Sequence, residues 1–177
     1  AAITFSGYTG AETLTNFPAL VVLGSGTISG FDAADCRTGG ADLRFADASG
    51  TEIPCEIEKW DAAGDSYVWV RVPELAGADT TISVYWCNPT AEAPNYAADG
   101  GVWSEDYAAV WHMQDANPAD STTNANNGAG TATAVVSGKA GGAIGFNGTA
   151  AQVNAGMGAS LNLPTALTVE GWVKLDG

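Results

Sequence analysis

Acidic side chains between residues 42 and 60 are the most prominent candidates for chemistry in this sequence. The stretch DLRFADASGTEIPCEIEKW contains five acids, Asp42, Asp47, Glu52, Glu56 and Glu58. Two carboxylates act as a general acid and base only when one is desolvated and both converge on a substrate. Their spacing along the predicted strands therefore decides whether these acids are catalytic.

Alternation predicts that the acids lie on the outer side of a β-hairpin. Successive residues of a strand face opposite sides of the sheet, so Leu43 and Phe45 share one face of the first arm. Ile53, Cys55 and Ile57 share a face of the second arm. A short Ala-Ser-Gly loop with a left-handed glycine joins the arms and brings the two apolar faces together.

In this register the carboxylates form an evenly spaced outward row. We expect Glu52, Glu56 and Glu58 to be solvent-exposed, with Arg44 as their charge partner, because ionised side chains are seldom buried without a partner. Asp42 shares the outward face of the first arm. The pattern therefore favours a solvated strand face over a catalytic pair.

The remaining candidates for chemistry are few. His112 is the only histidine, so a histidine metal cluster or a Ser-His-Asp triad is not expected, and no nucleophile-elbow, P-loop or zinc-protease motif occurs. Asp115, Asp120, Asn124 and Asn127 could offer oxygens to Ca²⁺, but they lack EF-hand spacing, which favours a polar loop without metal. We therefore predict no enzyme activity and no cofactor, with Ca²⁺ as the weaker alternative.

Three aromatic residues predicted to face outward suggest a binding surface. Trp60, Tyr67 and Trp69 could form a flat platform on which sugar rings stack. The alternative is that they shield cross-strand neighbours or an adjoining domain, which is the more common use of half-exposed aromatic side chains. We favour shielding and keep the three as candidate ligand-binding residues.

The cysteines have no metal-binding spacing. Cys36, Cys55 and Cys87 form an odd set without a CxxC pair. One disulfide plus one free thiol in an oxidising compartment and three unrelated buried cysteines are both compatible with this pattern. The sequence does not show which two would pair.

Composition excludes several classes of protein. The formal charge of −14 argues against nucleic-acid or anionic-membrane partners, and 46% apolar residues exclude a disordered chain. The apolar runs are far shorter than the roughly 20 residues of a membrane helix, so no membrane insertion is expected. The start at Ala1 has no basic or apolar leader region, which is typical of a mature secreted chain or of an engineered start.

Short alternating segments separated by turn residues predict an all-β protein. The expected strands of the first half include the segment around Ile3 and Phe5, residues 17–23, residues 67–72 and residues 81–86. An Ala-, Pro- and Gly-rich connector follows over 89–102. Further strands are expected at 108–113, 131–136, 143–146, 151–154 and 167–175. We therefore predict a β-sandwich over 1–88, the connector, and a second unit over 103–177.

Two family resemblances cover nearly the whole chain. NFPALVVL, GADLRFADASGTEIPCEIEKW, YVWVRVPEL and ISVYWCNP resemble a bacterial domain of unknown function that commonly precedes LamG-like modules. VWHMQ, the Asp120-Ser121-Thr122 loop, GGAIGFNGT and LTVEGWVKL resemble the N-terminal part of a concanavalin-like, LamG-type jelly-roll. The first resemblance implies Gly where this chain has Cys87.

The resemblances imply a jelly-roll-like β-sandwich followed by a partial concanavalin/LamG-like sandwich. LamG-like sandwiches are considerably longer than residues 103–177, so we expect unpaired sheet edges that an oligomer or a partner chain completes. The domain of unknown function occurs in large secreted or envelope proteins, some fused to TolQ/ExbB/MotA-type proton channels. The expected localisation is thus extracellular, periplasmic or at the bacterial cell surface.

The expected function is a non-catalytic binding, adhesion or spacer module with a glycan or protein ligand. One alternative is an accessory carbohydrate-binding module of a polysaccharide-degrading enzyme. Another is a sensor domain of a TolQ/ExbB-type envelope protein. The sequence does not identify the ligand.

Overall fold

The structure, a computed structural model, describes residues 1–103 and 107–175, apart from the side chain of Ala78. Residues 104–106 and 176–177, which belong to the predicted second unit, lie outside the described residues. The chain divides into two compact units, Ala1–Asp106 and Tyr107–Gly177.

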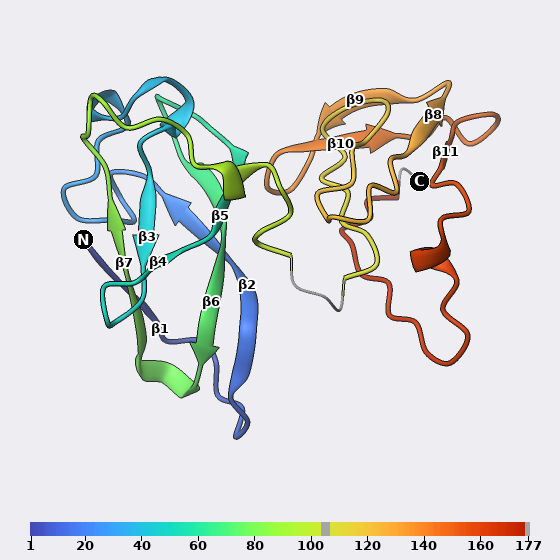
Figure 1. The fold of residues 1–177 in the computed structure, drawn as a ribbon. Helices are drawn as coiled ribbons and strands as arrows, with labels where there is room; N and C mark the ends of the chain where they lie inside the picture. Colours follow the sequence, from blue (N-terminus) through green and yellow to red (C-terminus); the bar gives the residue numbers. More distant parts are fainter. Residues whose placement is uncertain (104–106, 176–177) are drawn as a thin grey trace. The chain divides into compact units, whose positions relative to one another are not determined.

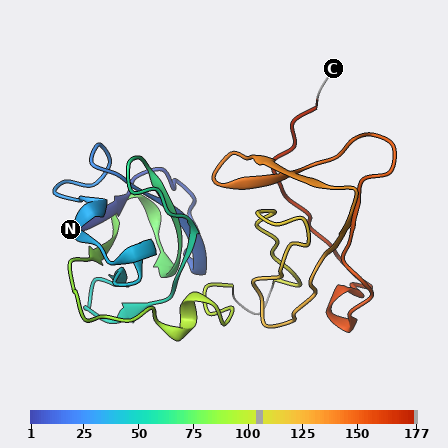
Figure 2. The same cartoon turned by 90° about the horizontal axis from the view of Figure 1, so that it is seen from above.

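Unit 1 is a β-sandwich of two antiparallel sheets, and the whole chain is all-β, as predicted. One sheet has the order β1-β7-β3-β4 and the other the order β2-β6-β5 (Figure 1). Figure 2 shows the two layers from above. The strands are β1 (Ala2–Phe5), β2 (Leu14–Leu23), β3 (Arg44–Ala46), β4 (Glu52–Ile53), β5 (Cys55–Lys59), β6 (Ser66–Leu75) and β7 (Thr80–Tyr85).

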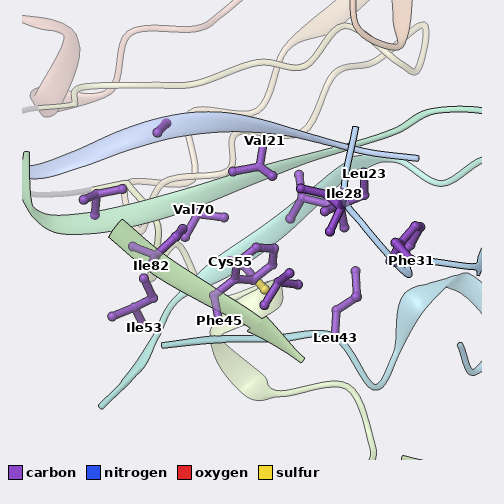
Figure 3. Close-up of a cluster of buried hydrophobic side chains, with 14 of the residues drawn as sticks. Val21, Leu23, Ile28, Phe31, Leu43, Phe45, Ile53, Cys55, Val70 and Ile82 are labelled. Atoms are coloured by element: carbon purple, nitrogen blue, oxygen red, sulfur yellow. The ribbon is translucent and has the colours of Figure 1, made fainter. Parts of the chain in front are cut away.

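Alternating apolar residues build the core between the sheets. Val68, Val70 and Val72 of β6 are buried while the residues between them are not, which confirms the predicted alternation. Ile82 and Val84 of β7 are likewise buried, whereas Ser83 between them is not. Figure 3 shows Val70 and Ile82 among core side chains from both sheets, such as Val21 and Phe45. Buried with them are Ala19, Val21, Leu23, Ile28, Phe31, Leu43, Phe45, Ile53, Cys55 and Leu75.

The predicted hairpin is confirmed at its apolar face. Phe45 pairs with Ile53 across β3 and β4, and Gly50 has the left-handed φ of 84° that the short loop requires. The Arg44 guanidinium lies 3.4 Å from the Glu52 carboxylate, and Glu52 is exposed, both as predicted. Asp47 accepts hydrogen bonds from the Ser49 hydroxyl and from backbone N–H groups of the loop, and these bonds lower its pKa.

The second arm of the hairpin does not continue as one strand. Pro54 separates β4 from β5, and the two strands belong to different sheets. Ile53 and Cys55 are both buried because each sheet turns one of them toward the shared core. Ile57 is only half-buried, so its predicted full burial was wrong.

The predictions for three of the acids were also wrong. Asp42 is only 2% exposed, because its carboxylate accepts backbone N–H bonds from Arg37 and Asn88. Glu58 is only 7% exposed: a β-bulge makes it the extra residue between the pairs of Ile57 and Lys59. Glu56 is half-buried instead of exposed.

Unit 2 contains two small two-stranded sheets in its described residues. β9 (Ala134–Ser137) pairs with β10 (Gly142–Gly145), and β8 (Ala129–Thr131) pairs with β11 (Gln152–Asn154).

Five 3-10 turns complete the regular structure described in the two units: η1 (Ala33–Asp35), η2 (Thr38–Gly40), η3 (Gly77–Asp79), η4 (Asn95–Ala97) and η5 (Ala159–Leu161).

Two strands predicted for unit 2 do not form. Residues 108–113 contribute only an isolated bridge between Trp111 and Asp120. Residues 167–175 have no strand partner among the described residues, and every side chain there is exposed. Alternation along this segment suits a strand, but a strand exists only where a second one pairs with it.

Candidate binding surface

A hollow between the edges of the two sheets is a candidate binding feature of unit 1. β1 ends one sheet and β2 ends the other, so each has one side that pairs with no other strand among the described residues. The hollow between them has a volume of about 570 Å³, within the ~300–1,000 Å³ of typical ligand pockets. It is lined by Thr4, Phe5, Ser6, Gly7, Tyr8, Leu14, Phe17, Pro18, Ala19, Leu20, Trp69 and Leu75.

The lining is apolar and carries no charged side chain, although the chain has a net charge of −14. Phe17 and Leu20 of β2 are 38% and 37% exposed, and both contribute to the same apolar lining. Leu20 pairs with Trp69 of β6. The Tyr8 hydroxyl donates to the carbonyl of Glu12 at 2.8 Å, which fixes the ring at the rim. The hollow therefore suits an apolar ligand.

The three predicted ligand-binding aromatics lie in different surroundings. Trp60 packs against the core and meets Phe31 edge-on, with ring centroids 6.5 Å apart. Tyr67 lies under the Lys59 ammonium, which is 5.9 Å from its ring centroid. That ammonium also bonds to Asp61 at 3.0 Å and lowers its pKa.

Trp69 lies in a cluster of indoles and carboxylates beside the hollow. Its ring meets the ring of Trp103 edge-on, with ring centroids 5.2 Å apart. The Trp69 indole N–H donates to Glu58 at 2.8 Å, and the Trp103 indole N–H donates to Glu56 at 2.6 Å. The two acids therefore act as hydrogen-bond acceptors for indoles. Of the three predicted residues, only Trp69 lines the hollow.

The predicted Ca²⁺ residues lie in a hydrogen-bonded loop of unit 2. The Asp120 carboxylate accepts from four groups: the backbone N–H of Val110, Thr122 and Asn126 and the Thr122 hydroxyl, at 2.8–3.0 Å. The Asn127 side-chain oxygen accepts from the Asp120 N–H at 2.9 Å.

The other two predicted Ca²⁺ residues bond elsewhere in the loop. Asp115 accepts from the Asn117 N–H, and Asn124 donates to the carbonyls of Tyr107 and Ala108. Bonded in this way, the four side chains do not form the oxygen cage that Ca²⁺ takes. Nor do the described residues contain a group of three His, Cys, Asp or Glu side chains that could hold a metal ion. Ca²⁺ binding therefore remains a prediction without structural support.

Most of the lining could not have been found by alternation within one strand. Phe5 belongs to β1, Phe17 and Leu20 belong to β2 of the other sheet, and Tyr8 lies between these two strands. None of the four was predicted as a site residue. The sequence signal that could have identified these residues is the pair of apolar segments near the N-terminus, around Ile3 and Phe5 and over residues 17–23.

In the part of the chain that is described, no helix has the length and apolar character needed to cross a bilayer.

Residues 39–103 match the model of a family described as a domain of unknown function (DUF2341). The match includes the hairpin and strands β3 to β7, whereas β1, β2 and unit 2 lie outside it. Searches of the curated proteins and of the solved structures found no match. Over residues 39–103, this chain is thus similar to a family that is itself described only as a domain of unknown function, DUF2341.

Proposed function

We propose that this chain is a non-catalytic binding module of the extracellular or periplasmic space, and that the hollow between β1 and β2 takes an apolar segment of a protein partner. The uncharged, apolar lining of that hollow carries the proposal. An apolar ligand gains about 25 cal/mol for each Å² that it removes from water there. Edge strands on both sides can add backbone hydrogen bonds to an extended peptide.

A protein segment suits this lining better than a glycan does. Sugar recognition needs polar side chains around an aromatic platform, whereas here the polar side chains of the lining are Thr4, Ser6, the Tyr8 hydroxyl and the Trp69 indole N–H. The Tyr8 hydroxyl and the indole N–H already donate within unit 1. The lining also contains no carboxylate or imidazole for acid–base catalysis, which supports a non-catalytic role.

Selection of random peptides displayed on phage tests this proposal. We expect enrichment of apolar peptides whose affinity falls at least about tenfold in Leu20→Asp, because a charge would enter the apolar hollow. Tyr85→Asp is the matched control, since Tyr85 is an exposed residue of β7 outside the lining. Its affinity should equal that of the wild type.

Three results would overturn the proposal. The first is that no peptide is enriched. The second is enrichment of peptides that bind Leu20→Asp and the wild type equally. The third is a signal on a glycan array that Leu20→Asp abolishes, which would assign the hollow to sugars. Thermal unfolding of both variants confirms that each is folded.

A further inference from the structure

Asp42 brings two cysteine-bearing segments together. One oxygen of its carboxylate accepts from the Arg37 N–H at 2.8 Å, and the other accepts from the Asn88 N–H at 2.9 Å. Cys36 directly precedes Arg37, and Cys87 directly precedes Asn88. The two cysteines therefore flank the same buried carboxylate, although about 50 residues separate them in the chain.

Contacts on either side of this carboxylate hold the same two segments alongside each other. Phe31 and Trp86 meet edge-on with ring centroids 5.4 Å apart. The Arg37 guanidinium forms an ion pair with Glu92 at 2.8 Å and also donates to the carbonyl of Ala91. Residues 31–37 and 86–92 thus run in the same direction, with the two cysteines between these contacts.

We propose that Cys36 and Cys87, which are free thiols in this structure, form a disulfide when the protein meets a small-molecule or protein disulfide. The bond would tie the 31–42 segment to the chain that follows β7. This inference stands independently of the proposed function.

Cys87 is the thiol that an oxidant can reach. The residue has φ 70°, in the left-handed region that favours glycine. Its side chain is exposed and therefore accessible to an oxidant.

The surroundings of Cys36 and Cys55 indicate which of these two thiols joins Cys87 in the disulfide. The pKa of Cys36 is raised to about 12, chiefly by burial and then by the nearby groups Asp42, Asp35 and Cys87. Cys55 lies in the core (Figure 3), and burial raises its pKa to about 12 as well. Because Cys55 is only 3% exposed, whereas Cys36 is half-buried and Cys87 is exposed, Cys55 is the cysteine expected to stay reduced.

The exchange proceeds in two steps. The Cys87 thiolate attacks one sulfur of the oxidant's disulfide, which forms a mixed disulfide and releases one thiol. Cys36 then loses its proton and attacks the Cys87 sulfur, and the second thiol leaves. In sum, two cysteine thiols are oxidised to one disulfide, and the oxidant's disulfide is reduced to two thiols.

Peptide mapping after equilibration with oxidised glutathione tests the proposal on the wild-type chain. Trypsin cleavage after Arg37, Lys59 and Arg71 leaves each cysteine on a different peptide. We expect monomeric protein to lose two of its three thiols and to yield a Cys36–Cys87 linked pair. Oxidation should raise the melting temperature by at least about 5 °C, because a loop of about 50 residues is closed.

Two variants complete the test. Cys87→Ser should abolish the rise in melting temperature on oxidation, whereas Cys55→Ala should keep the rise, even though its own melting temperature is lower. Retention of three free thiols by the oxidised monomer would overturn the proposal. So would a link that includes Cys55, or a disulfide found only between two chains.

Discussion

The two units of this chain bury different kinds of groups. Unit 1 packs Val, Ile, Leu and Phe side chains between two sheets. The buried residues described in unit 2 are instead Pro118, Thr122, Asn126 and Gly128, around the Asp120 carboxylate. Apolar burial organises the first unit, and a hydrogen-bonded Asx-rich loop organises the second.

Because of this difference, we expect the two units to respond differently when a buried residue is substituted. Loss of an apolar core residue removes contacts and leaves a cavity. Loss of a buried acceptor instead leaves several donors without a partner, at a cost for each donor. The predictions below test this contrast from the largest expected effect to the smallest.

The largest effect is expected from Phe45→Ala. Phe45 is fully buried at the centre of the unit 1 core, and its truncation should lower the free energy of unfolding by about 3–5 kcal/mol. Val135→Ala in β9 is the control: because Val135 is 50% exposed, its cost should be below about 0.5 kcal/mol. Urea unfolding of both variants measures the difference. Equal costs would contradict the assignment of the apolar core to unit 1.

Asp120→Asn should give the largest effect among the polar changes. The new amide group places N–H donors where the carboxylate accepts from Thr122 and Asn126, so we expect a loss of about 1–3 kcal/mol confined to unit 2. Hydrogen exchange should show lost protection at the amides of Val110, Thr122 and Asn126.

Asp115→Asn is the matched control for this change. Asp115 is exposed and accepts a hydrogen bond from the Asn117 N–H, so its replacement should cost less than about 0.5 kcal/mol. If Asp120→Asn behaves like this control, the carboxylate does not organise the loop.

Glu58→Gln tests a polar contact of unit 1 that lies outside the apolar core. The amide oxygen can still accept from the Trp69 indole, so this hydrogen bond keeps its acceptor but loses the charge, and we expect a cost of about 0.5–1 kcal/mol. Glu52→Gln on the exposed hairpin is the control. Denaturant unfolding monitored by tryptophan fluorescence compares the free energies of unfolding of the Glu58→Gln and Glu52→Gln variants. A cost of Glu58→Gln above that of Asp120→Asn would contradict the expectation that the larger polar effect lies in unit 2.

The smallest effect is expected at the hairpin loop and depends on pH. Hydrogen bonds lower the pKa of Asp47 in the folded state, so its contribution to stability is present above the unfolded pKa of 3.8 and is lost as the pH falls through the folded value. Asp47→Asn should therefore flatten the fall in melting temperature between about pH 5 and pH 2. An unchanged acid slope would show that the loop bonds do not favour the carboxylate.

Local sequence patterns were sufficient where a strand is regular along its length. The valines of β6, the pairing of Phe45 with Ile53 and the left-handed Gly50 follow from alternation and turn chemistry within a few residues. The all-β class follows from the same signals repeated along the chain. For the candidate site, the sequence predicted Trp69 but not the remaining lining of the hollow.

The tertiary structure decided the features that depend on residues far apart in the chain. Asp42 is buried because Asn88 donates to it, and Glu58 because a bulge turns it toward Trp69. The 167–175 segment alternates like a strand but lacks a pairing partner among the described residues. Alternation specifies which side a residue faces only after a partner strand has fixed the register, and that partner is not encoded in the segment itself.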